Sequence, residues 1–187
     1  VMILFVNGAE LDSQSQEYVL RLPKGIRQDH PIHVLHLQTR YQNGACPSPR
    51  LIILAEEDSQ ATIIESFYGF DDTLYYQQSM THIQLSEHAK VHYYKCQNEG
   101  DRAIHTAHIS AVQRHQSYLA TAHVVMGAMV SQDYLSYRLL GEGATCESLG
   151  FYHSHCQQQL SIQSNIYHSA SYTNSRQLFK GVAADQS

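Results

Sequence analysis

The chain has 187 residues, of which 43% are hydrophobic and 16% charged, and its formal net charge is −5 without any block of Lys or Arg. This length suits one domain with a substantial core, whereas nucleic acid and anionic membranes are bound through clustered positive charge. The composition therefore argues against both partners. The longest apolar runs, Leu51–Ala55 and Val124–Val130, are also too short to cross a bilayer.

The beginning of the chain and its cysteines bear on its location. The first six residues, Val1-Met2-Ile3-Leu4-Phe5-Val6, are strand-like and carry no basic n-region, so no secretory signal is expected. The four cysteines have no tight spacing and predict no disulfide framework. We therefore expect a reducing, cytoplasmic setting.

Short extended segments follow one another along the chain, separated by turn residues. Met2–Gly8 is predicted to be a strand that ends in the turn dipeptide Asn7-Gly8, and a further turn is predicted at Leu22–Gly25. Further strands are expected at Ile32–Thr39, Arg50–Ala55, Ala61–Phe67, Leu74–Tyr76, Thr81–Leu85, Lys90–Cys96, Ile104–Val112, Tyr118–Met126, Tyr134–Leu140 and Thr145–Tyr152. Connections are expected at Asn43–Pro49, Gly69–Asp72 and Asn98–Asp101. No segment longer than about 12 residues keeps a helical apolar stripe, so an all-β fold is predicted.

A turn followed by a small residue and a strand recurs along the chain. With Ala61, Ala89, Ser117 and Ala144 as marks, the steps are 89 − 61 = 28, 117 − 89 = 28 and 144 − 117 = 27 residues. A fixed period of this size indicates stacked repeats that cannot bury their apolar faces singly. Two positions after each mark stands a residue suited to an inward column: Ile63, Val91, Leu119 and Cys146. The repeat predicts a β-solenoid that occupies residues 1–187 as a single domain.

The amino-acid sequences of several segments resemble those of a known family. The matching stretches are Phe5–Gly8, Pro49–Leu54, Ala89–Glu99, Gly150–Tyr152 and Ser175–Val182. In order and spacing they are similar to the SufD members of the SufB/SufD family of iron–sulfur cluster assembly scaffold proteins. The resemblance implies a right-handed parallel β-helix core, no enzymatic activity, and a complex with SufB and the ATPase SufC. It also implies that the cluster forms transiently at the SufB–SufD interface and that this chain alone binds no cofactor stably.

The chain also departs from the family pattern. The family's Lys-Cys-Ser-His-Gly-Ala segment and its helical SufC-binding segment have no counterpart before Ser187, and Gln158–Ser161 replaces a Gln-His-x-Asp motif. No site residue can therefore be transferred from the family. We expect the core to be truncated on its C-terminal side, with an open solenoid end that allows self-association.

The best metal-ligand pattern in the sequence is His153-Ser154-His155-Cys156. On a strand, His153 and His155 would face the same side, with Cys156 on the other. Cys46, in a Gly/Pro loop, and Cys96, near a strand end, are further candidates because thiolates suit iron–sulfur chemistry. For all four residues, solvated or inert side chains are the competing interpretation.

Two other classes of protein compete with a scaffold. A carbohydrate-active β-helix enzyme would need carboxylates clustered on one face, and here they are scattered. A cupin-like metal-binding barrel would use the His153/His155 pair, but the residues that follow it, Cys156–Leu160, include no Glu to complete the ligand set. Parallel stacking of the strands would exclude the barrel.

Overall fold

The computed structural model describes residues 1–6, 9–10, 17–39, 46–69 and 74–184. Within these ranges the chain forms fourteen strands and no helix. The strands are β1 (Met2–Val6), β2 (Ala9–Glu10), β3 (Glu17–Leu22), β4 (Ile32–Gln38), β5 (Arg50–Ala55), β6 (Gln60–Gly69), β7 (Tyr75–Leu85), β8 (Lys90–Glu99), β9 (Ala103–Gln113), β10 (Tyr118–Gly127), β11 (Val130–Leu139), β12 (Thr145–Ser154), β13 (Gln159–His168) and β14 (Asn174–Ala183).

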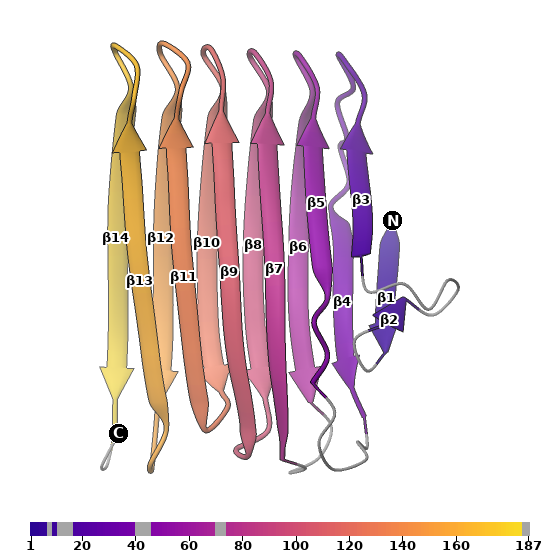
Figure 1. Ribbon diagram of the computed structural model, residues 1–187, viewed down its shortest axis with the longest axis vertical. Coiled ribbons are helices and arrows are strands. Elements are labelled where there is room, and N and C mark those ends of the chain that lie inside the picture. The colour runs from indigo at the N-terminus through magenta and orange to yellow at the C-terminus, as the bar shows by residue number, and fades with distance from the viewer. Residues whose placement is uncertain (7–8, 11–16, 40–45, 70–73, 185–187) are drawn as a thin grey trace.

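These strands wind into a parallel β-solenoid of about six turns. Sheet A has the order β14-β12-β10-β8-β6-β4-β1-β2, and sheet B has the order β13-β11-β9-β7-β5-β3. All neighbouring strands pair in parallel except β1 and β2. In Figure 1 the two sheets stand one behind the other, so each coil contributes one strand to each sheet. The predicted all-β solenoid is confirmed, and parallel pairing excludes the cupin-like barrel.

Several strand bounds differ from the sequence prediction. Residues 75–85 form one strand, β7, because Gln77 and Ser79 point inward and bond to other buried polar groups instead of interrupting the strand. β8 continues through the predicted turn to Glu99, whose buried carboxylate is likewise bonded inside. The strands β13 and β14 were not predicted. The predicted turn at Asn7-Gly8 and most of the Gly69–Asp72 connection lie outside the described residues.

The register of the first repeat differs from the predicted one by two residues. Ala61 pairs with Val91, and the structural equivalent of Ala89 is Ser59, thirty residues earlier. Because strand side chains alternate with a period of two, a slip of two residues keeps the same side chains inside. Ile63, Val91, Leu119 and Cys146 are accordingly all fully buried. The four residues of the predicted inward column therefore do face the interior. The residue level with Val91 is, however, Ala61, and Ile63 lies two residues further along β6.

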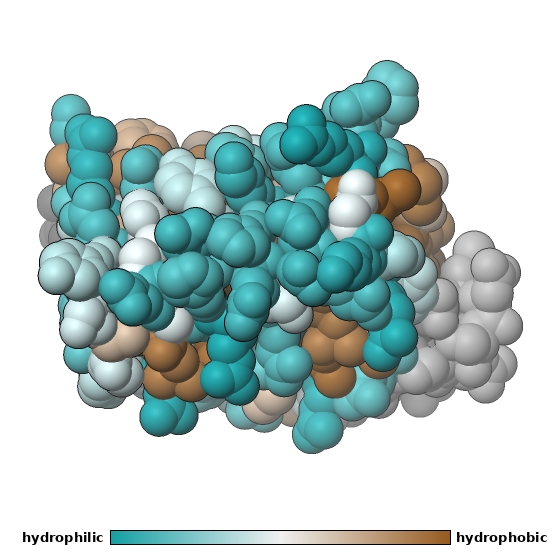
Figure 2. Space-filling model, turned by 90° about the horizontal axis from the view of Figure 1, so that it is seen from above, coloured by the Kyte–Doolittle hydropathy of each residue, from teal (hydrophilic) through white to brown (hydrophobic). Residues whose placement is uncertain are grey.

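The turns after the sheet B strands, at the top of Figure 1, repeat one backbone geometry. Asp58, His88, Gln116 and Tyr172 have positive φ, and Gly143 takes the equivalent place in its coil. The N–H of the residue at this position donates to the next coil, as from Asp58 to the Glu87 carbonyl at 3.1 Å. The turns are thus joined by hydrogen bonds along the solenoid axis. Figure 2, which looks onto this end, shows hydrophilic residues over most of it.

Two glycines allow the last coils to pack. A Cβ on Gly150 would lie 2.1 Å from Cδ1 of Phe179, its partner on β14, and a Cβ on Gly181 would lie 1.9 Å from the ring of Tyr152. Each ring therefore occupies the space left by a missing side chain on the adjacent coil. This exchange explains physically why Gly and aromatic residues alternate in two of the stretches that resemble the family.

Candidate functional site

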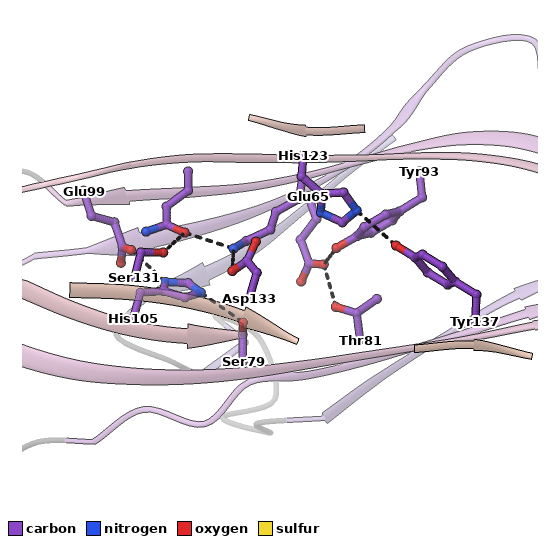
Figure 3. Close-up of polar contacts among 12 residues, drawn as sticks. Glu65, Ser79, Thr81, Tyr93, Glu99, His105, His123, Ser131, Asp133 and Tyr137 are labelled. Carbon is purple, nitrogen blue, oxygen red and sulfur yellow. Dashed lines mark hydrogen bonds and ion pairs between the residues drawn. The ribbon is translucent and has the colours of Figure 1, made fainter. Parts of the chain in front are cut away.

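The interior of the solenoid is divided into an apolar half and a polar half. Next to the upper turns, the inward residues are Ala, Val, Leu and Ile from both sheets. Toward the opposite end of the strands, charged and hydroxyl side chains from β6, β7, β8, β9, β10 and β11 point at one another (Figure 3), and His36 of β4 joins them through Glu65. We name this second group the inner polar cluster. It consists of His36, Glu65, Ser79, Thr81, Tyr93, Lys95, Gln97, Glu99, His105, His123, Ser131, Asp133 and Tyr137.

Glu65 binds three neighbours within the cluster. Its Oε1 lies 2.9 Å from Nε2 of His36, while Oε2 accepts from Tyr93 at 2.5 Å and from Thr81 at 2.7 Å. Burial alone would raise the pKa of Glu65, but the hydrogen bond and charge of His36, helped by the two hydroxyls, lower it below the ordinary value. Burial and the neighbouring carboxylate raise the pKa of Tyr93 well above its usual range. Glu65 is therefore ionised and Tyr93 neutral.

Lys95 makes the central ion pair. Its ammonium group donates to Oδ1 of Asp133 at 2.5 Å and to Oε1 of Gln97 at 2.9 Å, and Ser131 donates to the same amide oxygen at 3.2 Å. Burial opposes ionisation of Asp133, but the charge of Lys95 outweighs it and lowers the pKa of the carboxyl. The pair is thus charged although both side chains are almost fully buried.

Glu99 forms the third buried pair. Its Oε2 lies 2.7 Å from Nδ1 of His105, and Oε1 accepts from Tyr75 at 2.8 Å. The other ring nitrogen of His105 lies 3.1 Å from Oγ of Ser79. Burial would raise the pKa of Glu99, but the charge and hydrogen bond of His105 lower it overall. Each buried carboxylate of the cluster therefore has a basic partner within 3 Å.

His123 is the one histidine of the cluster without a carboxylate at hydrogen-bond distance. Its Nε2 lies 3.1 Å from the hydroxyl of Tyr137, which in turn lies 3.2 Å from Thr121. Burial, with a smaller contribution from the charge of Lys95, outweighs the opposing effect of Asp133 and lowers the pKa of His123 to about 4. His123 is consequently neutral near neutral pH.

The cluster is closed along the solenoid axis by apolar side chains. In one inward row of sheet A the aligned residues are Ile3, Val34, Glu65, Lys95, His123, Gly150 and Phe179. Its three polar members therefore occupy consecutive middle coils, with aliphatic groups before them and Phe179 after them. Because a shift in register would separate these buried charges from their partners, we expect the cluster to specify the register of the middle coils. The cluster was not predicted from the sequence, although polar residues at inward positions of the repeat, such as Lys95 and His123, are a signal of it.

The predicted histidine pair lies at the end of β12. The strand ends at Ser154, so His155 and Cys156 belong to the following turn, where Cys156 has a φ of 55°. The face argument from strand alternation therefore does not apply to them. The rings of His153 and His155 are nevertheless neighbours, with centroids 5.8 Å apart, and Sγ of Cys156 lies 3.5 Å from Nδ1 of His155.

The two cysteine candidates lie on different sides of the molecule. Cys46 is exposed just before β5 of sheet B, whereas Cys96 is half-buried on the outer face of sheet A, where burial raises the pKa of its thiol. Cys146 is enclosed in the core, as predicted, and burial raises its pKa to about 12. Across the described residues, no three His, Cys, Asp or Glu side chains are grouped so that they could hold a metal ion.

The outer faces of the strands carry few carboxylates. Within the strands β4 to β14, Glu147 is the sole outward-facing acidic side chain among the described residues, while Glu65, Glu99 and Asp133 point inward. Other exposed acidic residues, such as Asp58 and Glu87, lie in the turns. A carbohydrate-active β-helix enzyme needs such groups together on one open face. The arrangement offers no support for that alternative.

Together these features define a protein class, a parallel β-solenoid with two sheets facing outward and its charged groups bonded to one another inside. A family model described as "SUF system FeS cluster assembly, SufBD core domain" matches residues 37–187. The chain therefore belongs to the SufBD family of iron–sulfur cluster assembly proteins, in agreement with the resemblance seen in its sequence.

Two curated relatives give the scale of the similarity. The chain is 26% identical over 139 residues to the iron-sulfur cluster assembly SufBD family protein slr0076 of Synechocystis, covering 70% of this chain and 31% of the relative. It is 24% identical over 180 residues to Protein ABCI7, chloroplastic, of Arabidopsis thaliana, covering 90% of this chain and 37% of the relative. The chain thus spans about a third of the length of the curated relatives it matches. No helix among the described residues is long and apolar enough to cross a membrane.

Proposed function

We propose that this chain is the core of a non-catalytic, SufD-type scaffold subunit in an iron–sulfur cluster assembly complex. Its partners would be a SufB homologue and a SufC-type ATPase, and the cluster would be cargo held transiently between the subunits. The observation that carries the proposal is the family match over residues 37–187, which covers ten of the fourteen strands, β5 to β14. A wall stiffened by buried ion pairs suits a part that must hold another subunit in one position.

The edge of sheet A is the surface through which we propose that SufB binds. Among the described strands β14 is the last of this sheet, and its residues pair with β12 on one side only. In a parallel ladder alternate residues donate to opposite neighbours. Asn174 and Ala184 donate to β12, so the odd-numbered residues between them direct their N–H groups to the open edge. An added strand could pair there.

Co-expression with SufB and SufC homologues from the same organism tests this function. We expect the tagged 187-residue chain to co-elute with SufB, and to show neither ATP hydrolysis nor a stable cluster when purified alone. Gln177→Pro removes one edge N–H and should abolish co-elution, whereas the matched Gln177→Ala variant keeps the donor and should retain it. A cluster bound at full occupancy by the chain alone would refute the proposal.

A complementation assay separates a SufD role from a SufB role. We expect the chain to restore cluster assembly in a strain that lacks SufD and not in one that lacks SufB. The reverse result would keep the family and overturn the finer assignment. Location in the cytoplasm also remains part of the proposal; one relative is chloroplastic by its name.

We also propose that His153 and His155 bind a transition metal weakly, since the two rings are neighbours at an exposed strand end. Cys46 and Cys96 are weaker candidates, because Cys46 precedes β5 of sheet B whereas Cys96 lies on β8 of sheet A. The His153→Ala/His155→Ala double variant should lose zinc uptake measured by calorimetry, while the matched His30→Ala variant, in an exposed loop, should not. Equal uptake by all three proteins would remove the site.

A further inference from the structure

The outer face of sheet A carries an uncovered apolar surface. Tyr68, Met126, Leu149, Phe151, Leu178 and Val182 point outward from β6, β10, β12 and β14, and each is between 37% and 49% exposed. The strand register makes three of them neighbours: Leu149 aligns with Leu178, and Phe151 follows Leu149 on the same face. Tyr68, Met126 and Val182 lie in the next outward row, where Asn98 and His153 alternate with them. We name these six residues the sheet A patch.

The large exposed side chains on the outer face of sheet B are more polar than those of the sheet A patch. The large exposed side chains there are Val19, Tyr76, Met80, Tyr134 and Tyr167, so three of the five carry a hydroxyl group. Parallel sheets are usually covered on both faces. Sheet B covers the inner face of sheet A, and no described segment covers its outer face.

The size of the sheet A patch suits a docked helix. With strands about 4.8 Å apart, the five strands from β6 to β14 span about 24 Å, and three outward rows add about 20 Å in the other direction. The resulting footprint of roughly 480 Å² lies within the range of about 300–600 Å² of the largest patch on a typical monomer, and such patches are often functional. A helix of about 16 residues has the same 24 Å length.

The charges on this face select the kind of helix. Lys90, Arg176 and Lys180 face outward around the patch, opposed only by Glu147, although the whole chain has a net charge of −5. None of these three basic groups forms an ion pair among the described residues. Two copies of the chain packed face to face would bring together two surfaces that both carry an excess of positive charge, which disfavours self-docking.

From the patch and its charges we propose that the outer face of sheet A docks an amphipathic helix of a separate protein, with acidic residues flanking its apolar stripe. Helix packing on a sheet face needs no free backbone groups, which sheet A does not offer there. The apolar stripe would lie on Leu149, Phe151 and Leu178, and the acidic flanks would reach Lys180 and Arg176. This site is separate from the β14 edge, so it goes beyond the assembly role proposed above.

Fluorescence anisotropy with a designed peptide provides the test. The probe is a labelled 18-residue helix with Leu at positions i, i+3, i+4 and i+7 and Glu beside them; the controls are a scrambled peptide and one with Lys in place of Glu. We expect saturable binding of the Glu peptide only. Phe151→Ser should weaken it at least tenfold, the matched Tyr134→Ser variant on sheet B should leave it unchanged, and Lys180→Glu should shift preference toward the Lys peptide.

Several results would overturn the proposal. They are absence of saturable binding, equal binding of the scrambled peptide, and an equal loss with Tyr134→Ser. Sedimentation velocity measures whether the chain forms a dimer. If the chain dimerises and Phe151→Ser makes it monomeric, the face belongs to a second copy and the helix proposal is wrong.

Discussion

At the scale of single residues, the inner polar cluster is unusual because it places three carboxylates where a solenoid normally stacks aliphatic side chains. Removing a charged pair from water costs several kcal/mol per ion, and mutual attraction returns this only with good geometry and further hydrogen bonds. The bonds to Tyr93, Thr81 and Tyr75 meet that condition for Glu65 and Glu99, whereas Oδ2 of Asp133 has no hydrogen-bond partner among the described residues. Such pairs contribute to specificity of register more than to net stability.

The Lys95–Asp133 pair gives a direct test of this balance. Lys95→Met leaves Asp133 charged and without its cation, so we expect a loss of about 3–5 kcal/mol in the free energy of unfolding. The double variant Lys95→Met/Asp133→Leu removes both charges and should recover most of that loss. Urea denaturation measures all three proteins, and a double variant no more stable than Lys95→Met would contradict the expectation.

His123 predicts a pH dependence with a defined sign. In the folded chain its pKa is lowered to about 4, so below the ordinary value of about 6.5 only the unfolded chain takes up this proton. Stability is therefore fully present above about pH 6.5 and falls as the pH drops toward about 4, by up to ~3 kcal/mol for this group. The lowered pKa values of Glu65, Glu99 and Asp133 add a loss in the same direction at lower pH.

Denaturation of a His123→Gln variant at about pH 7 and about pH 5 checks this expectation. The wild-type chain should lose about 2 kcal/mol more than the variant between these two values, from ~1.4 kcal/mol per pH unit. The matched His30→Gln variant, in an exposed loop, should behave like the wild type. Identical pH slopes for His123→Gln and wild type would count against a neutral His123.

At the scale of elements, packing between coils depends on complementary residues on adjacent strands. Gly150 of β12 and Phe179 of β14 occupy one inward row, as do Tyr152 and Gly181. Each of the two strands thus contributes one aromatic ring and one glycine. Each ring fits only because the residue opposite it is a glycine. The two coils recognise each other by shape at this point.

A Gly150→Ala variant tests whether the packing of β14 on β12 depends on the missing side chain at position 150. The added methyl group would meet the Phe179 ring at 2.1 Å, and overpacking of this kind costs about 1–3 kcal/mol. Adding Phe179→Leu creates room and should restore part of the loss. Thermal denaturation followed by circular dichroism compares the two variants, and an unchanged Gly150→Ala midpoint would show that β14 moves away freely.

Some strands and buried contacts could be predicted from the sequence and others could not. Turn residues and alternation gave the solenoid and the buried column through Ile63, Val91 and Leu119, because inward positions depend only on parity. β13 and β14 were missed because their half-exposed residues, such as Ile162 and Leu178, do not contrast with their neighbours. The link from Lys95 to Asp133 could not be predicted, since it joins residues 38 apart on opposite sheets.

At the scale of the whole molecule, each coil contacts only the coils beside it, so stability should vary along the axis. The middle coils contain the inner polar cluster and strands such as β9, whose inward residues are all buried. The outermost strand, β14, has mostly exposed side chains. The molecule therefore combines a rigid middle with a more accessible C-terminal face.

Hydrogen exchange on the 187-residue chain measures this gradient. We expect the backbone amides of β8, β9 and β10 to exchange most slowly and those of β14 most rapidly, with β12 between them. Binding of a SufB strand at the β14 edge should slow β14 selectively. Uniform protection from β6 to β14 would instead indicate a single cooperative unit.

The connections at the lower end of Figure 1 differ in length from one coil to the next. Five, three, two and four residues join β6 to β7, β8 to β9, β10 to β11 and β12 to β13. Each strand pairs in register with its neighbours whatever the length of the connection before it. A change in the length of a connection therefore leaves the inward-facing side chains in place. During evolution this end of the wall could therefore gain and lose residues, and with them new surface features, without any change to the interior.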